Sequence, residues 1–149
     1  MTQAKEAELE KEINRILAAC RLAALSTCDG KSPHASLVGF VHHPESASII
    51  FATPSSGKKY GNLKKLPNAA LLISETAGTD NNFFGSAALT AAGECGEIGN
   101  KEEVIPCYIK KFPGLEAFAR DSKTAFFRLK VRSFYLVRNF QEVSELHVR

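Results

Sequence analysis

The sequence has no tryptophan and no pair of closely spaced cysteines. Because no C-x-x-C pair occurs, a zinc knuckle and a thioredoxin-type redox site are excluded, and no metal site is predicted. No apolar run approaches the length of a membrane span, and the charged start MTQAKEAELEKE lacks the apolar core of a secretory signal. We therefore expect a soluble, reduced, cytoplasmic protein with no membrane partner. Its cysteines are expected to be buried free thiols: Cys20, Cys28, Cys95 and Cys107.

Two common phosphate-binding signatures are also absent. The chain contains neither GxxxxGK[ST] nor GxGxxG, which excludes a Walker loop and the dinucleotide-binding fingerprint. Its 149 residues fit one domain, 1–149, and a hydrophobic fraction of 44% allows a single core. The net charge of +3 is mild, so a nucleic-acid partner is not expected.

The pattern of apolar residues predicts a helix followed by short strands. Apolar residues recur at helical spacing over residues 3–20. The Asp29-Gly30 pair then predicts a hairpin. His42 and His43 are expected in a solvated turn. The remaining elements of the first half are strands at 21–28, 34–43, 47–53 and 68–75, and a two-turn helix at 58–66.

The second half contains a loop at 76–84, a strand at 85–98 and short helices after Asn100 and at 115–121. Its last two strands are predicted at 123–131 and 133–140, around a tight turn at Arg132-Ser133. Strands joined by hairpins or one short helix favour a mainly β fold, an antiparallel barrel or sandwich of about six strands with short helices packed at its ends. We divide the domain into an N-terminal helix (1–20), a barrel with helical inserts (21–138) and a C-terminal tail (139–149).

The segment TPSSGKKYGNLKKLP, residues 53–67, concentrates hydroxyl groups and lysines between two apolar strands. Hydroxyls, backbone N–H groups at the start of a helix and the ammonium groups of Lys58 and Lys59 are the groups that bind a phosphate. Gly57 is expected to let the backbone turn without a Cβ clash. The alternative is a solvated basic helix, and this interpretation suits Lys64 and Lys65 best.

The stretch from LAALSTCDGKSPHASLVGFV through IIFATPSSGKKYGNLKKLPNAALLIS resembles the pyridoxamine 5'-phosphate oxidase-like flavoproteins. The shared order is a strand, the Asp29-Gly30 turn, a strand led by Pro33, a strand ending in Thr53, a Gly-Lys-Lys turn and an Ala-Leu-rich strand. GSAALTAAGECGEI and YIKKFPGLEAF look like the family's fifth strand and the helix that follows it. Each motif is weak alone, but their order is fairly specific.

The resemblance implies a split β-barrel that works as a homodimer and holds FMN in the groove between its subunits. In that family the turn at the start of the short helix binds the phosphate group of FMN. The strand at residues 34–38 runs beside the ribityl chain and the isoalloxazine ring, and the position of Thr53 often touches the flavin. The cofactor-binding residues that it implies are Ser36, Leu37, Val38, Thr53, Ser56, Gly57, Lys58 and Lys59.

Two departures refine this expectation. The arginine that true pyridoxamine phosphate oxidases carry on the second strand has no match at His34 or Ala35, and their Arg/Trp-rich C-terminal signature is missing. The resemblance therefore implies an oxidase-related member and not a true pyridoxamine phosphate oxidase. We expect an FMN-binding flavoprotein, an oxidoreductase acting on a small molecule, with unidentified catalytic residues. The alternative is a non-catalytic flavin or haem carrier, because no acid–base group can be identified.

Overall fold

The computed structural model describes residues 2–43, 47–75 and 86–149. The predicted loop at 76–84 and residues 44–46 lie outside the described residues. Within the described ranges, no helix is both long and apolar enough to cross a membrane. The helices are α1 (Gln3–Ala19), α2 (Lys58–Lys65), α3 (Ile105–Lys111) and α4 (Glu116–Arg120), with short 3-10 turns at Lys101–Glu103 and Pro113–Leu115.

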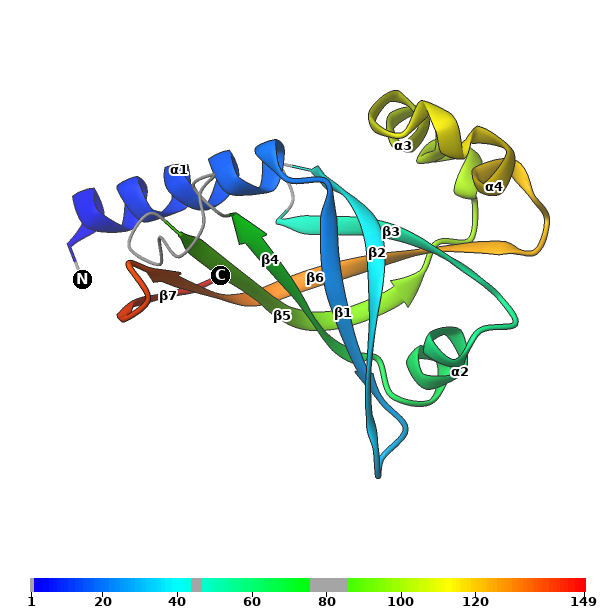
Figure 1. The fold of residues 1–149 in the computed structure, drawn as a ribbon, viewed down its shortest axis with the longest axis horizontal. Helices are drawn as coiled ribbons and strands as arrows, with labels where there is room; N and C mark the ends of the chain where they lie inside the picture. The colour runs from blue at the N-terminus through cyan, green and yellow to red at the C-terminus, as the bar shows by residue number, and fades with distance from the viewer. Residues whose placement is uncertain (1, 44–46, 76–85) are drawn as a thin grey trace.

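The strands form a closed antiparallel barrel. They are β1 (Leu22–Cys28), β2 (Pro33–His43), β3 (Ser48–Pro54), β4 (Asn68–Glu75), β5 (Ala87–Glu97), β6 (Thr124–Arg138) and β7 (Glu142–His147). Their order is β3-β2-β1-β4-β5-β6-β7, and β3 also pairs with β6, so β1 to β6 close a ring and β7 pairs outside it (Figure 1). The predicted antiparallel barrel with short helices is confirmed.

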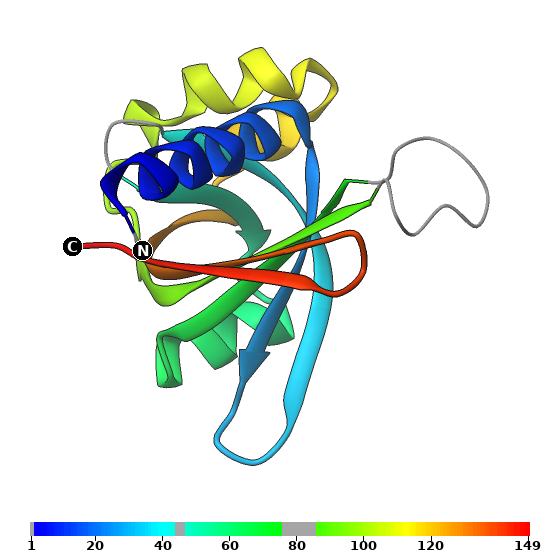
Figure 2. The same ribbon diagram turned by 90° about the vertical axis from the view of Figure 1, so that its left-hand side faces the viewer.

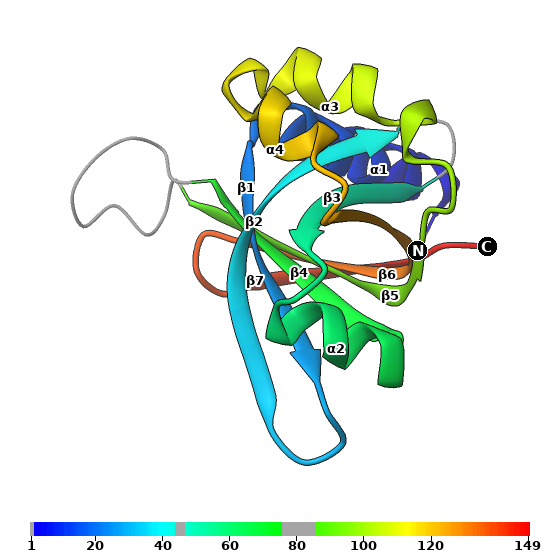
Figure 3. The ribbon, with the colours of Figure 1, turned by 90° about the vertical axis from the view of Figure 1, so that its right-hand side faces the viewer.

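The helices cover the barrel on two sides. Figures 1 and 3 show α1 and α2 on opposite sides of the barrel, with α3 and α4 beside β3. The ring of strands is clearest from the end of the molecule where the N-terminus lies, with α1 running above it (Figure 2). The apolar stripe of α1 joins the same buried cluster as the barrel interior, while α3 and α4 bury theirs on the outer face of β3 and β6.

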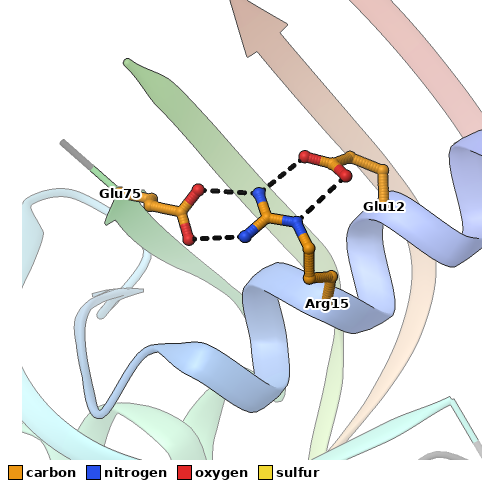
Figure 4. Close-up of polar contacts among 3 residues, drawn as sticks. All are labelled: Glu12, Arg15 and Glu75. Carbon is orange, nitrogen blue, oxygen red and sulfur yellow. Dashed lines mark hydrogen bonds and ion pairs between the residues drawn. The ribbon is translucent and has the colours of Figure 1, made fainter. Parts of the chain in front are cut away.

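An arginine clamp fixes α1 to the end of β4. Arg15 donates to both carboxylate oxygens of Glu75, at 3.1 Å and 2.7 Å, and to both oxygens of Glu12, at 3.1 Å and 2.7 Å (Figure 4). These bonds raise the pKa of Arg15, and the same arginine lowers the pKa of Glu12. Because Arg15 is half exposed, the clamp orients α1 more than it stabilises the fold.

The prediction of two final strands around a turn at Arg132-Ser133 is wrong. β6 runs unbroken through both residues, and Arg132 is accommodated as an extra residue at a register shift opposite Ala92 and Gly93. The chain reverses later, where Asn139 and Phe140 adopt φ values of 49° and 68°. Residues that we expected in a tail therefore form β7.

Two other expectations also fail. All four cysteines are free, but only Cys95 is buried and Cys107 is exposed. Burial raises the pKa of the Cys95 thiol to about 12. The strand predicted at 34–43 does include His42, which belongs to β2, so the expected solvated turn at this residue is wrong. His42 is half-buried, and its desolvation, followed by the charges of His43 and Lys111, lowers its pKa to about 4. The imidazole is therefore neutral near pH 7.

Candidate functional site

The candidate site lies where the barrel splits between β2 and β3. These strands pair only from Phe40↔Phe51 to His43↔Ser48. From Pro33 to Gly39, β2 pairs with β1 alone, so its other backbone edge has no strand partner among the described residues. If the register continued, Val38 would lie opposite Thr53. The two strands diverge instead, and α2 follows the end of β3 (Figure 3).

The turn after β3 ends in the N-terminus of α2. Ser55 anchors this turn, because both its backbone N–H and its hydroxyl donate to Lys123 O, at 2.8 Å and 2.9 Å. Gly57 is the N-cap and supplies no side-chain capping bond. The first N–H groups of a helix have no partner within it and carry a partial positive charge. The start of α2 therefore has N–H groups that can bind an anion.

The predicted phosphate-binding residues lie together at this turn. Ser56 and Lys58 are exposed, and Lys59 is half-buried. The physical reason given for Gly57 is wrong, because its φ of −80° and ψ of 162° are open to any residue. A Cβ at Gly57 would lie 3.5 Å from the nearest atom, Pro54 O, which is ordinary contact.

Thr53 lies beneath the turn. Its side chain is fully buried, and its hydroxyl donates to Pro54 O at 3.2 Å. A Cβ on Gly57 would lie 3.9 Å from the Thr53 hydroxyl, which places Thr53 directly below the start of α2. Thr53 therefore supports the turn from inside the barrel and does not present its side chain on the surface.

The three predicted residues on β2 face different environments. Leu37 points outward with 65% of its side chain exposed, whereas Val38 is buried in the barrel core. Ser36 is half-buried, and its buried hydroxyl has no hydrogen-bond partner among the described residues. An unsatisfied buried hydroxyl costs about 1–3 kcal/mol. Ser36 is therefore the residue on this strand whose side chain most clearly lacks a partner.

An acidic residue stands near the lysines. Asp29, in the β1–β2 hairpin, accepts from the backbone N–H groups of Ser32 and Lys31 at 2.8 Å and 2.9 Å. Its pKa is lowered first by these two bonds and then by the charges of Lys58 and Lys65. The hairpin carboxylate thus offsets part of the basic charge near α2.

Three side-chain hydrogen bonds that fix α2 were not predicted from the sequence. Asn62 donates to the hydroxyl of Thr27 at 3.1 Å, and both side chains are buried. On the other side of α2, Glu97 accepts from the Tyr60 hydroxyl at 2.9 Å and from Lys64 at 3.1 Å. Lys64 is therefore partly neutralised by an ion pair, unlike a freely solvated lysine.

In the part of the chain that the structure describes, no group of three or more His, Cys, Asp or Glu residues is arranged to hold a metal ion. The arrangement instead suits an anionic ligand with a phosphate group, because it combines two lysines, free helix N–H groups and an unpaired hydroxyl near an open strand edge.

Comparison with solved structures shows the fold. A haem-binding protein from Mycobacterium smegmatis matches with a TM-score of 0.82 at 17% identity, over 93% of this chain and 57% of that one. HutZ, a haem storage protein from Vibrio cholerae, matches with a TM-score of 0.71 at 17% identity, over 93% of this chain and 94% of that one. At such identities the likeness concerns the fold alone.

Comparison of sequences identifies the family. The chain is 31% identical over 74 residues to a pyridoxamine 5'-phosphate oxidase homolog from Schizosaccharomyces pombe, a match over 44% of this chain and 39% of that protein. The chain thus matches well under half of the length of this relative. The family model described as pyridoxamine 5'-phosphate oxidase matches residues 9–138. The chain therefore belongs to the pyridoxamine 5'-phosphate oxidase family.

Proposed function

We propose that this protein binds FMN at the split between β2 and β3 and acts as an oxidoreductase on a small molecule. The observation that carries the proposal is the start of α2, where free N–H groups lie beside Lys58 and Lys59 at the point where β3 leaves β2. A phosphate monoester carries roughly −1.5 to −2 charges at neutral pH, so two lysines nearly balance it.

The residues present fit the cofactor at both of its ends. The turn of Ser56, Lys58 and Lys59 would hold the phosphate, and the unpaired hydroxyl of Ser36 would find an acceptor or donor on the ribityl chain. The free edge of β2 offers backbone N–H and C=O groups to a flat polar ring. When bound, FMN supplies the redox chemistry through its isoalloxazine ring.

We further propose that a second copy of the chain completes the site. The register aligns Leu37, Ala24, Leu72, Thr90 and Tyr135 in one row across the outer face of β2, β1, β4, β5 and β6. Leu37, Leu72 and Tyr135 are 65%, 48% and 36% exposed. An uncharged, largely apolar row of this kind favours burial against another protein surface. Because it begins at Leu37, next to Ser36, a partner docked there would adjoin the cofactor site.

The absorption spectrum of the purified protein after addition of FMN and gel filtration tests the proposal. We expect the visible absorbance of the flavin to elute with the protein at the volume of a dimer. The Lys58→Gln/Lys59→Gln variant should lose most of this flavin, while Lys110→Gln, an exposed lysine on α3, should retain it. Loss of flavin from the wild type, or equal retention by all three proteins, would contradict the proposal.

Haem binding is the second candidate. It is favoured by the half-buried His34, which lies on the same β2 segment two residues before Ser36, so both side chains point to the same side of the strand. Imidazole is a common axial ligand of haem iron. A Soret band that appears on addition of haemin and is lost in His34→Ala, but not in His43→Ala, would support this candidate over FMN.

A further inference from the structure

A groove away from the candidate site has a basic rim and an apolar floor. It lies between the second half of α1, β2 and the end of α3, and its volume is about 690 Å³. Small-molecule sites usually measure roughly 300–1,000 Å³. Ala18, Ala19 and Val41 provide its apolar floor, over the buried side chain of Leu17. Among the described residues that line it there is no Asp or Glu, whereas four are Lys or Arg: Lys11, Arg15, Arg21 and Lys111.

Of these four cations, Lys11, Arg21 and Lys111 have no carboxylate partner among the described residues. Arg15 is neutralised by Glu12 and Glu75, as Figure 4 shows. Among the described residues, Arg21 and Lys111 instead form hydrogen bonds only to carbonyl groups. Arg21 donates to Lys111 O at 2.9 Å, and Lys111 donates to Cys20 O at 2.7 Å.

The same two cations lie over aromatic rings. The Lys111 ammonium is 4.2 Å from the centre of the Phe40 ring, and the Arg21 guanidinium is 5.0 Å from the centre of the Phe112 ring. These rings and carbonyls orient both cations, and the carbonyl contacts also cap the ends of α1 and α3. Partial charges at helix ends offset only part of two full positive charges. Burial and the neighbouring Arg21 accordingly lower the pKa of Lys111.

Most of the donor capacity of this pair is unused. A guanidinium has five N–H donors and an ammonium has three, whereas Arg21 and Lys111 each use one donor in the hydrogen bonds described above. We propose that this groove binds an amphipathic organic carboxylate, whose carboxylate group lies between Arg21 and Lys111 and whose apolar body lies on Ala18, Ala19 and Val41. A guanidinium can form two parallel hydrogen bonds with a carboxylate. An inorganic anion could accept the same hydrogen bonds, but it has no apolar body to occupy the rest of the groove. The proposal is independent of FMN binding.

Calorimetric titration of the full chain with decanoate below its micelle concentration tests this site. Decanoate should bind, and decan-1-ol should bind at least tenfold more weakly. Decylammonium should not displace bound decanoate. Arg21→Gln and Lys111→Gln should each weaken decanoate binding about tenfold or more, as expected for the loss of a charge-assisted hydrogen bond. Lys110→Gln is the matched control, since this exposed lysine of α3 does not line the groove, and it should bind as the wild type does.

A second variant blocks the groove without removing charge. Ala18 is exposed on α1 and lines the groove, so Ala18→Trp should fill it, keep the fold and abolish decanoate binding. The Lys58→Gln/Lys59→Gln variant should bind decanoate normally, which separates this site from the proposed FMN site. Three results would overturn the proposal. Decanoate and decan-1-ol could bind equally well, or Arg21→Gln and Ala18→Trp could both bind decanoate with wild-type affinity. The third is a loss of decanoate affinity in Lys110→Gln that equals the loss in Arg21→Gln. Tight binding of inorganic phosphate that excludes decanoate would overturn the assignment to a carboxylate.

Discussion

Asn62 of α2 donates a buried hydrogen bond to Thr27 of β1, with 3.1 Å between Nδ2 and Oγ1. Asn62 is 5% exposed and Thr27 is 3% exposed, so neither side chain can exchange this bond for water without local opening. The bond joins the helix whose N-terminus forms the candidate phosphate site to the strand beside β2. It therefore links barrel stability to the position of the turn.

Replacing Asn62 by alanine should destabilise the protein by about 1–3 kcal/mol, because the Thr27 hydroxyl is left buried without its partner. Urea unfolding followed by circular dichroism measures this change. The Asn62→Leu/Thr27→Val double variant removes both polar groups and should recover part of the loss. If the double variant loses more stability than Asn62→Leu and Thr27→Val lose in sum when each is made alone, a simple hydrogen-bond origin is contradicted.

Replacing Gly93 by alanine should destabilise the barrel, because a Cβ there would lie 2.0 Å from Lys130 O across the β5–β6 register shift. We expect a loss of about 1–3 kcal/mol or more, as for other overpacked sites. Gly96→Ala is the matched control on the same strand, since nothing lies within 4 Å of its Cβ position. Equal melting temperatures for the two variants would show that the bulge tolerates a side chain.

Acidification should destabilise the protein through His42. Burial lowers its pKa from 6.5 to about 4 in the folded state, so the unfolded chain binds a proton at a higher pH than the folded chain does. This contribution to stability is complete above pH 6.5 and is lost as the pH falls towards 4. The melting temperature should fall less over this range in His42→Gln than in the wild type. His43→Gln, at the exposed neighbour, should keep most of the wild-type fall.

A charge in the outer apolar row should weaken dimerisation. Leu72 is 48% exposed and pairs with Ala24 and Thr90 in the middle of the row. Burying a leucine contributes about 1.5–3 kcal/mol, so Leu72→Asp should raise the dimer dissociation constant at least tenfold in analytical ultracentrifugation. Leu115→Asp, which changes a 39% exposed leucine in the 3-10 turn before α4, is the control. If the wild type is a monomer, or if both variants dimerise equally, the row is not the interface.

Elements set by local chemistry could be predicted from the sequence. The stripe of Ile13, Ile16 and Leu17 is buried as its spacing requires, and Gly30 has the φ of 101° that a tight hairpin favours. The β6 bulge could not be predicted in this way. Arg132 and Ser133 look like a turn locally, and the register shift opposite Ala92 and Gly93 depends on pairing with β5, which is distant in sequence.

The same distinction between local and long-range features applies to the candidate site. The order of residues from Thr53 to Lys59 is local, and the structure does bring these residues together at one turn. The orientation of individual side chains depends on the closed barrel. Thr53 faces inward because of strand alternation, and Asn62 is buried although it is a polar residue on a basic helix. Neither fact has a signal in the sequence of that segment.

The most direct test of the central claim is calorimetric titration with FMN and with riboflavin, which lacks the phosphate. If Lys58, Lys59 and the start of α2 hold a phosphate, FMN should bind at least tenfold more tightly than riboflavin, since one charge-assisted hydrogen bond contributes about 1.5–3 kcal/mol. The Lys58→Gln/Lys59→Gln variant should bind the two flavins with nearly equal, weak affinity. Equal binding of FMN and riboflavin by the wild type, or an FMN preference that survives in the variant, would contradict the account.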